Sequence, residues 1–130
     1  MKFIALIYAD ERHYTEASPE ETAATFAAHG EFGEASRAAG VFEGGDGLQA
    51  TATATTVRVR DGERLLTDGP FAETKEQLGG FYALECKDLD EALEWAARIP
   101  EAKFGAIEVR PVIDYAALQG TMNGAAAESA

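Results

Sequence analysis

The chain has 130 residues, the size of one domain, and its 23 acidic residues outnumber its 11 basic ones, for a net charge of −12. Phosphate backbones and anionic lipid headgroups repel so acidic a chain, which argues against nucleic-acid and membrane partners. No run of residues approaches the roughly 20 apolar positions of a membrane span, and the sequence begins without a signal-peptide pattern. We therefore expect a cytoplasmic protein.

Cysteine and histidine are scarce. The single cysteine, Cys86, cannot form an internal disulfide, and a multi-cysteine metal site is excluded as well. The two histidines, His13 and His29, cannot supply a three-histidine metal cage. We expect no metal and no other cofactor.

The charge is distributed unevenly. Residues 1–46 carry 3 basic and 9 acidic side chains, residues 76–130 carry 4 and 10, and residues 47–75 carry 4 of each. Acidic outer thirds are typical of a solvated surface that keeps a protein soluble. The neutral middle third is either ordinary surface or a stretch that lies against a partner subunit or a ligand.

The first part of the chain predicts one strand and one long helix. Residues 1–9 are apolar on both faces, which is typical of a central strand covered on both sides. Ser18 and Glu21 mark a helix start, because Ser18 can cap the backbone and Glu21 completes a capping box. The helix is expected to run to Ala39 and to stop at Gly40.

The rest of the chain predicts a hairpin, two further strands and a second helix. Residues 53–60 alternate apolar and polar side chains, and Asp61-Gly62 favours a tight turn into an antiparallel strand at residues 63–67. A glycine-rich phosphate-binding loop follows a strand and opens a helix. The glycine-rich run at residues 44–47 does neither, so we expect a plain turn there. The remaining predicted elements are a strand at residues 81–86, a helix from Asp88 to Pro100 and a strand at residues 107–112.

The predicted order, β-α-β-β-β-α-β, is that of a split βαβ unit with an extra strand, and it indicates a ferredoxin-like α+β sandwich over residues 1–115. Both helices are expected on one face of an antiparallel sheet. Nothing in so short a chain covers the other face, so we expect a homodimer that packs sheet against sheet, as in a dimeric α+β barrel. Residues 116–130, which include the alanine-rich stretch Leu118–Ala130, are expected to form a flexible tail.

The first helix carries a stripe of small and polar side chains where a core-filling helix would carry leucine or isoleucine. On a helical wheel this stripe lies between Phe26 and Phe32, and its members are Thr22, Thr25, His29, Gly33 and Ser36. His29 is then either a histidine bonded to a nearby carbonyl or a group at the border of a ligand cleft, in which Gly33 leaves room for the ligand.

A loop of about thirteen residues follows the hairpin, and loops of that length tend to be functional. Its first residue, Asp68, either accepts backbone N–H groups of its own turn or orients the imidazole of His29 from the end of a strand. Phe71 and Tyr82 are expected to shape an apolar pocket, and the alternative for Tyr82 is a place in the core. These residues, with Gly33, form the predicted site.

Motifs in this loop and its flanks are similar to those of the YCII-related proteins, in particular their DGPF group. The resemblance covers roughly residues 1–115. The motifs that carry it are Asp68-Gly69-Pro70-Phe71, Glu73-Thr74-Lys75-Glu76, Gly79-Gly80-Phe81, Asp61-Gly62, Asp90-Glu91-Ala92 and Glu108-Val109-Arg110-Pro111.

The resemblance implies a ferredoxin-like domain that dimerises sheet to sheet. One branch of the family is similar to a dehalogenase of a chlorinated muconolactone, and other members are encoded beside or fused to extracytoplasmic-function sigma factors. In YCII-type members, a helix histidine eleven residues before a glycine is proposed to act with an aspartate nine residues after it. His29 and Gly40 keep the first spacing, whereas Ala38 stands at the aspartate position, which leaves the carboxylate to Asp68.

Two functions remain open. The first is a small dimeric enzyme, an isomerase, lyase or dehalogenase, in which His29 moves a proton on a compact oxygenated molecule and Asp68 orients the imidazole. Gly33, Phe71 and Tyr82 would bind the substrate. The second is a non-enzymatic ligand-binding or regulatory module associated with sigma-factor signalling, in which His29 is replaceable.

Overall fold

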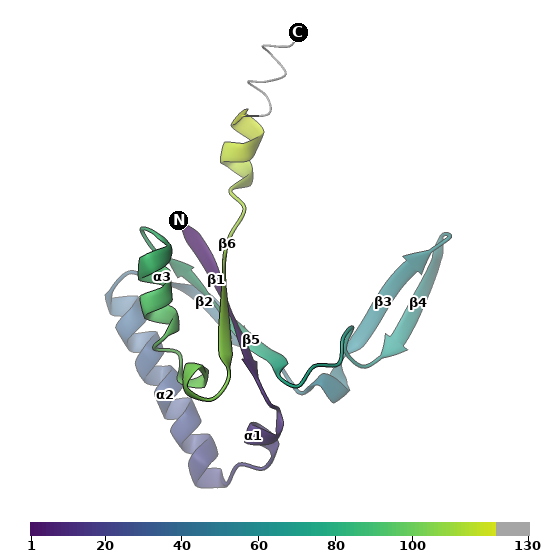
Figure 1. The fold of residues 1–130 in the computed structure, drawn as a ribbon, viewed down its shortest axis with the longest axis horizontal. Coiled ribbons are helices and arrows are strands. Elements are labelled where there is room, and N and C mark those ends of the chain that lie inside the picture. Colours follow the sequence, from purple (N-terminus) through teal and green to yellow (C-terminus); the bar gives the residue numbers. More distant parts are fainter. Residues whose placement is uncertain (122–130) are drawn as a thin grey trace.

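A computed structural model describes residues 1–121. Its strands belong to two separate sheets, one of four strands and one of two, and its long helix lies beside the larger sheet (Figure 1). In chain order the elements are β1 (Lys2–Ala9), α1 (Arg12–Thr15), α2 (Pro19–Ala38), β2 (Phe42–Gly47), η1 (Thr51–Thr53), β3 (Thr55–Arg60), β4 (Glu63–Asp68), β5 (Gln77–Glu85), α3 (Leu89–Ala96), η2 (Pro100–Lys103) and β6 (Ala106–Pro111).

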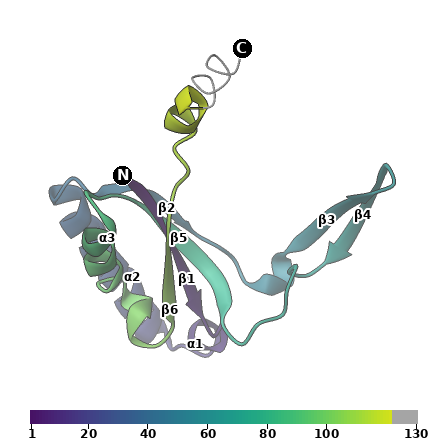
Figure 2. The ribbon, with the colours of Figure 1, turned by 45° about the horizontal axis from the view of Figure 1, so that its top comes forward.

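The larger sheet has the strand order β2-β5-β1-β6, and its neighbouring strands are all antiparallel. β1 lies between β5 and β6, as the apolar residues on both of its faces predict. Helices α2 and α3 lie on the same side of this sheet (Figures 1 and 2). The ferredoxin-like α+β fold expected from the sequence is therefore confirmed.

The core lies between this sheet and its helices. Phe3 of β1 and Leu84 of β5 face each other across the register and have no exposed surface. Ser36 of α2 is also fully buried, and its hydroxyl donates to the backbone oxygen of Phe32 at 2.7 Å. The buried hydroxyl thus keeps a hydrogen bond, which avoids the cost of an unpaired polar group in the core.

The opposite side of the larger sheet, which we call the open face, has no helix of the described residues above it (Figures 1 and 2). Side chains alternate along a strand, so Ile4 and Leu6 point to this side, and both are partly exposed. In the register with β5, Ile4 lies beside Ala83 and Leu6 beside Phe81. One chain therefore leaves the apolar centre of the open face accessible.

The ends of α2 follow from local chemistry. The Oγ of Ser18 accepts the N–H of Glu21 at 3.1 Å, and the Oε1 of Glu21 accepts the N–H of Ser18 at 3.3 Å, which completes the predicted capping box. Gly40 has a φ of +72°, a conformation that favours glycine and closes the helix. The predicted helix is confirmed.

One prediction is wrong: the glycine-rich run at residues 44–47 belongs to strand β2 and is not a plain turn. The strand is hard to recognise because glycine shows no alternation of apolar and polar side chains. The glycines are needed for close packing of β2 on β5. A Cβ on Gly45 would lie 2.6 Å from the carbonyl oxygen of Phe81, and a Cβ on Gly80 would lie 2.7 Å from that of Asp46.

The predicted hairpin forms, but its place in the fold differs from a strand of the main sheet. Asp61 and Gly62 both have positive φ angles, 51° and 76°, as a tight two-residue turn requires. Strands β3 and β4 pair with each other in a sheet of their own, and the hairpin projects away from the larger sheet (Figures 1 and 2). We call residues 55–68 the arm.

The chain continues past β6. Residues 115–121 are helical, and residues 122–130 of the predicted tail lie outside the described residues. Among residues 1–121, no helix has both the length and the apolar character required to cross a membrane.

Candidate functional site

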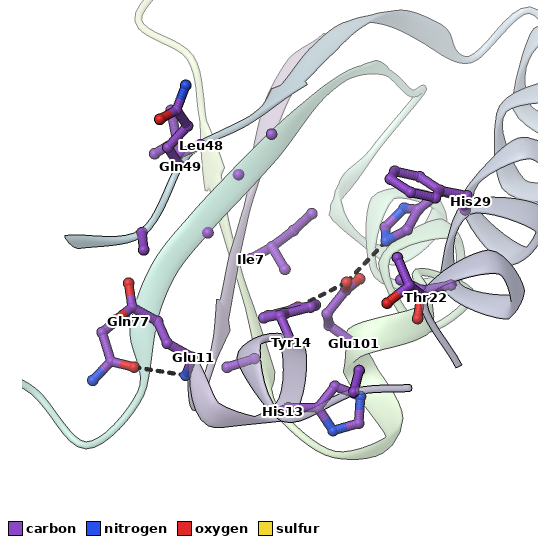
Figure 3. A pocket seen from close by; sticks show the side chains of 18 of the residues that line it. Ile7, Glu11, His13, Tyr14, Thr22, His29, Leu48, Gln49, Gln77 and Glu101 are labelled. Carbon is purple, nitrogen blue, oxygen red and sulfur yellow. Dashed lines mark hydrogen bonds and ion pairs between the residues drawn. The ribbon is translucent and has the colours of Figure 1, made fainter. Parts of the chain in front are cut away.

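A cavity of about 530 Å³ opens between the helices and one end of the larger sheet (Figure 3). Its walls come from α1, the N-terminal half of α2, and the ends of β1, β2 and β5 that lie closest to them. Phe26 and Leu48 line it with side chains that are 74% and 52% exposed, so the cavity is open to solvent at its apolar rim. A cavity of this size and character is typical of a small-molecule site.

His29 stands in this wall and is hydrogen-bonded at both ring nitrogens. Its Nε2 lies 2.9 Å from Oε2 of Glu101, and its Nδ1 lies 2.7 Å from the hydroxyl of Tyr82. Oε2 of Glu101 also accepts the hydroxyl of Tyr14 at 2.9 Å. Two tyrosines, a histidine and a carboxylate thus form one continuous network, part of which Figure 3 shows.

Four separate elements place these groups together. His29 comes from the middle of α2, Tyr82 from the helix side of β5, and Tyr14 from the short helix α1. Glu101 comes from η2, the 3-10 turn that follows α3 and begins at Pro100. Since each group is attached to a different element, the network exists only in the folded chain.

Glu101 is more deeply buried than His29. The side chain of Glu101 is 4% exposed, while that of His29 is 25% exposed. Burial alone would raise the pKa of Glu101, but the hydrogen bond and charge of His29, with the Tyr14 hydroxyl, hold this pKa below its ordinary value. Glu101 is therefore the fixed negative charge of the site.

The second carboxylate oxygen of Glu101, Oε1, is buried and has no hydrogen-bond partner among the described residues. A buried oxygen without a partner costs free energy, and such atoms are rare in folded proteins. Both side-chain hydrogen bonds that Glu101 makes in the network are therefore accepted by Oε2.

The two tyrosines are held in their neutral form. Burial, followed by the hydrogen bond to Glu101, raises the pKa of Tyr14 well above its ordinary value. Burial and the charge of Glu101 also raise the pKa of Tyr82. Both hydroxyls consequently keep their protons at neutral pH and act as donors.

These roles fix the direction of the hydrogen bonds. An ionised Glu101 can only accept, so Nε2 of His29 carries a proton and donates it. In the neutral imidazole, Nδ1 is then an acceptor for the hydroxyl of Tyr82. The carboxylate of Glu101 thus sets the tautomer of His29. When the hydroxyl proton of Tyr82 leaves its oxygen, Nδ1 of His29 can accept that proton.

The cavity is acidic. Among the residues that line it, the acidic ones are Glu11, Glu21, Asp46 and Glu101. No lysine or arginine is among the described residues that line it. The carboxylate of Glu11 is tied down, because it accepts the backbone N–H of Thr51 at 2.6 Å and the hydroxyl of Thr51 at 2.9 Å.

The structure brings together only some of the predicted site residues. His29 and Tyr82 both line the cavity and are hydrogen-bonded to each other. Gly33, one turn along α2 from His29, is buried beside the side chain of Arg37 and does not line the cavity. The C-terminal part of the polar stripe, Gly33 and Ser36, is therefore buried, and its N-terminal part, Thr22, Thr25 and His29, borders the cavity.

Asp68 and Phe71 lie elsewhere. Asp68 is the last residue of β4, at the base of the arm, and it does not line the cavity. Phe71 is 80% exposed, and the guanidinium of Arg58 lies 5.7 Å from the centre of its ring. Within one chain, the carboxylate that contacts His29 is that of Glu101.

Sequence reasoning missed Glu101 and Tyr14. In the sequence, Glu101 lies 72 residues from His29 and 87 residues from Tyr14. Neither lies in a motif, and Glu101 resembles any acidic residue of a surface turn. The one available signal was the polar stripe around His29, which indicates a cavity but not the residues opposite it.

Among residues 1–121, no group of three or more histidine, cysteine, aspartate or glutamate side chains could hold a metal ion.

Comparison with known proteins identifies relatives of this chain. The sequence profile of the YCII-related domain matches residues 1–116. A protein of Rhizobium meliloti (strain 1021), named only as uncharacterised, is 50% identical over 70 residues. The match covers 52% of this chain and 56% of that protein, so the chain spans little more than half the length of this relative.

Proposed function

Because the chain belongs to the YCII-related family, whose profile covers residues 1–116, we propose that it is a small acid–base enzyme acting on a compact oxygenated molecule. The observation that carries this proposal is the His29–Glu101 contact of 2.9 Å in the wall of an open cavity of about 530 Å³. The Asp68-Gly69-Pro70-Phe71 motif supports membership of the DGPF group within the family.

The proposed reaction begins with a carbon acid, a C–H group beside a carbonyl. The oxygen of Tyr82 takes the proton from this carbon while its own proton passes to Nδ1 of His29, and the electron pair of the broken C–H bond forms an enolate. Glu101 stabilises the imidazolium that results. Return of the proton to a different carbon gives an isomer, and loss of a leaving group from the neighbouring carbon completes an elimination.

A proton-transfer group placed in this way contributes about 10²–10⁴ in rate. Glu101 takes the orienting role that the sequence predicts for Asp68. Tyr14 holds Glu101 in place through their hydrogen bond of 2.9 Å, so it acts as a positioning residue. The reaction class is therefore an isomerase, lyase or dehalogenase.

The charge of the cavity indicates an uncharged substrate. Glu11, Glu21 and Glu101 line the cavity, and a ligand carboxylate near them would be repelled and would find no arginine or lysine in the described lining. A neutral ketone, aldehyde, ester or lactone avoids this repulsion. We therefore assign the site to neutral carbonyl compounds.

We also propose that the protein works as a homodimer. The support is the open face, where Ile4, Leu6 and Phe81 form an apolar surface that no described helix covers. Two such faces packed together would remove this surface from water, which contributes about 25 cal/mol for each Å² of apolar surface buried. Sheet-to-sheet packing would leave the cavity accessible, because the cavity lies on the helix side.

One observation favours a second function, a ligand-binding or regulatory module associated with sigma-factor signalling. Both nitrogens of His29 are already hydrogen-bonded, so the imidazole offers no free base to a ligand. In that case the cavity would only bind its ligand, and the network would serve as a rigid wall.

Hydrogen exchange in D₂O separates the two functions. The test incubates the full chain with a panel of neutral ketones and lactones and follows the loss of each α-proton signal by NMR. The enzyme proposal predicts faster exchange with the wild-type chain than with His29→Gln. Exchange at the uncatalysed rate for every compound, together with binding of one of them at the cavity, would support the binding module instead.

A further inference from the structure

Two large apolar side chains lie at the mouth of the cavity, and neither has a part in the reaction proposed above. Phe26 of α2 and Leu48, which directly follows β2, both line the cavity, and more than half of the surface of each residue is exposed. Figure 3 shows Leu48 on the other side of the cavity from His29. We call Phe26 and Leu48 the rim pair.

Phe26 interrupts the polar surface of its helix. Other exposed positions of α2, such as Glu20, Glu31 and Glu34, carry charged side chains. Phe26 precedes His29 by three residues, so the two side chains lie on the same side of the helix, about one turn apart. The proposed homodimer would use the opposite side of the larger sheet and would leave Phe26 exposed (Figure 2). A ligand in the cavity, in contrast, would lie beside this ring.

The segment that carries Leu48 is hydrogen-bonded at both ends. The N–H of Leu48 donates to the backbone oxygen of Gly79 at 2.8 Å. Three residues later, the carboxylate of Glu11 accepts the backbone N–H and the hydroxyl of Thr51. The N–H of Glu11 in turn donates to Oε1 of Gln77 at 2.9 Å. These hydrogen bonds hold Leu48 at the mouth, so its side chain belongs to a pre-formed wall.

The cavity wall contributed by β1 is apolar as well. Ile7 and Ala9 of this strand line the cavity, and both are buried. In Figure 3, the side chain of Ile7 lies between those of Leu48 and His29. A ligand that extends from Tyr82 to the rim pair would therefore contact hydrocarbon along its path.

The cavity is larger than the reacting group requires. Its volume is about 530 Å³, and cavities of roughly 300–1,000 Å³ bury most of the surface of a drug-sized ligand. A carbonyl group and its neighbouring carbon would occupy only the end beside Tyr82 and His29. The remaining volume has apolar walls, which favour contact with hydrocarbon over contact with water.

We propose that the rim pair binds a hydrocarbon chain of the substrate, which is then a neutral carbonyl compound whose chain reaches from Tyr82 to Phe26 and Leu48. The role of the rim pair rests on the proposed function, which puts the reacting carbon at Tyr82. A chain long enough to reach the rim pair buries its methylene groups against both side chains, whereas a short chain leaves both side chains in water. The rim pair thus determines which neutral carbonyl compounds bind tightly.

The test titrates the full ¹⁵N-labelled chain with methyl propyl, methyl pentyl and methyl heptyl ketone and obtains each dissociation constant from the NMR signals of cavity residues. Each ketone has two more methylene groups than the one before it. A fully buried methylene tightens binding about fourfold, so each step is expected to tighten binding on the order of tenfold. Equal dissociation constants for the three ketones would overturn the proposal.

Phe26→Ala and Leu48→Ala are each expected to weaken binding of methyl heptyl ketone about tenfold and to leave that of methyl propyl ketone within about twofold of the wild type. This difference identifies the rim pair, because a collapsed cavity would weaken the binding of all three ketones alike.

Leu93→Ala is the matched control, since Leu93 of α3 is exposed to a similar extent as Leu48 but does not line the cavity. This variant is expected to bind every ketone like the wild type. A loss of affinity in Leu93→Ala equal to that in Leu48→Ala would show adsorption to exposed apolar surface, and the role of the rim pair would be wrong.

Affinity and α-proton exchange distinguish the role of the rim pair from the proposed reaction. If a longer chain tightens binding while exchange in D₂O stays at the uncatalysed rate, the rim pair binds the chain and the enzyme proposal is wrong. If exchange is catalysed but affinity does not depend on chain length, the enzyme proposal stands and the role of the rim pair is wrong. Failure of all three ketones to bind would overturn the role of the rim pair and the assignment to neutral carbonyl compounds.

Discussion

The imidazole of His29 and the carboxylate of Glu101 lie 2.9 Å apart, although 72 residues separate them in the chain. One sits on a long helix and the other on a 3-10 turn after the second helix. Their contact joins the two halves of the fold at the wall of the cavity.

Removal of the Glu101 charge is expected to lower the pKa values of Tyr14 and Tyr82. Both values are raised by burial and by the nearby carboxylate, so Glu101→Gln removes one of the two causes. Absorbance at alkaline pH, which reports tyrosine ionisation, measures the change. Asp68→Asn is the matched control, and its titration should overlay that of the wild type. A shift of the curve in Asp68→Asn and none in Glu101→Gln would transfer the carboxylate role to Asp68.

The pH dependence of stability is expected to report Glu101 as well. Its pKa is lower in the folded chain than its ordinary value of 4.5. A lowered carboxyl pKa contributes stability that is complete above 4.5 and is lost as the pH falls through the folded value. The free energy of unfolding, measured with urea at a series of acidic pH values, should therefore fall less steeply in Glu101→Gln. An identical slope in both proteins would contradict the pairing of Glu101 with His29.

Tyr82→Phe is expected to separate chemistry from stability. The variant keeps the aromatic ring, which packs 4.6 Å from the ring of Phe32, and loses only the hydroxyl bonded to His29. Loss of one hydrogen bond costs about 1 kcal/mol, so the urea midpoint should change little. The rate of solvent exchange on a substrate should fall about a hundredfold or more, since the proton relay is broken. Undiminished exchange would remove Tyr82 from the proposed reaction.

Ligand charge is expected to decide affinity for the cavity. Phenylacetamide and phenylacetate have nearly the same shape and differ in charge, and the lining of the cavity includes Glu11, Glu21 and Glu101. Titration of the labelled chain by NMR should show the amide shifting the signals of cavity residues at a lower concentration than the acid. Tighter binding of phenylacetate would show that a cation reaches the site, and the assignment to neutral compounds would be wrong.

The sequence predicted the fold through its local signals. Ser18 and Glu21 mark the start of the long helix, Asp61 and Gly62 mark the hairpin turn, and both signals act over a few residues. Strand β2 escaped because its glycines contribute no side-chain pattern. Its place in the sheet depends on how closely Gly45 can approach β5, and no local signal in the sequence shows that approach.

The sequence predicted the part of the site that the first helix and Tyr82 contribute. The small and polar stripe of the first helix indicated a cavity beside His29, and Tyr82 was expected to line it. Glu101 could not be found in this way, because its position depends on the packing of the turn after α3 against α2. The spacing of motifs instead favoured Asp68, which lies at the base of the arm.

The central claim is that Glu101 sets the tautomer of His29, and ¹⁵N NMR of the labelled imidazole ring tests it without any substrate. At a pH where the ring is neutral, we expect a proton on Nε2 and none on Nδ1, with the signals changed by Glu101→Gln and unchanged by Asp68→Asn. A proton on Nδ1 in the wild-type chain, or signals that respond to Asp68→Asn and not to Glu101→Gln, would contradict it.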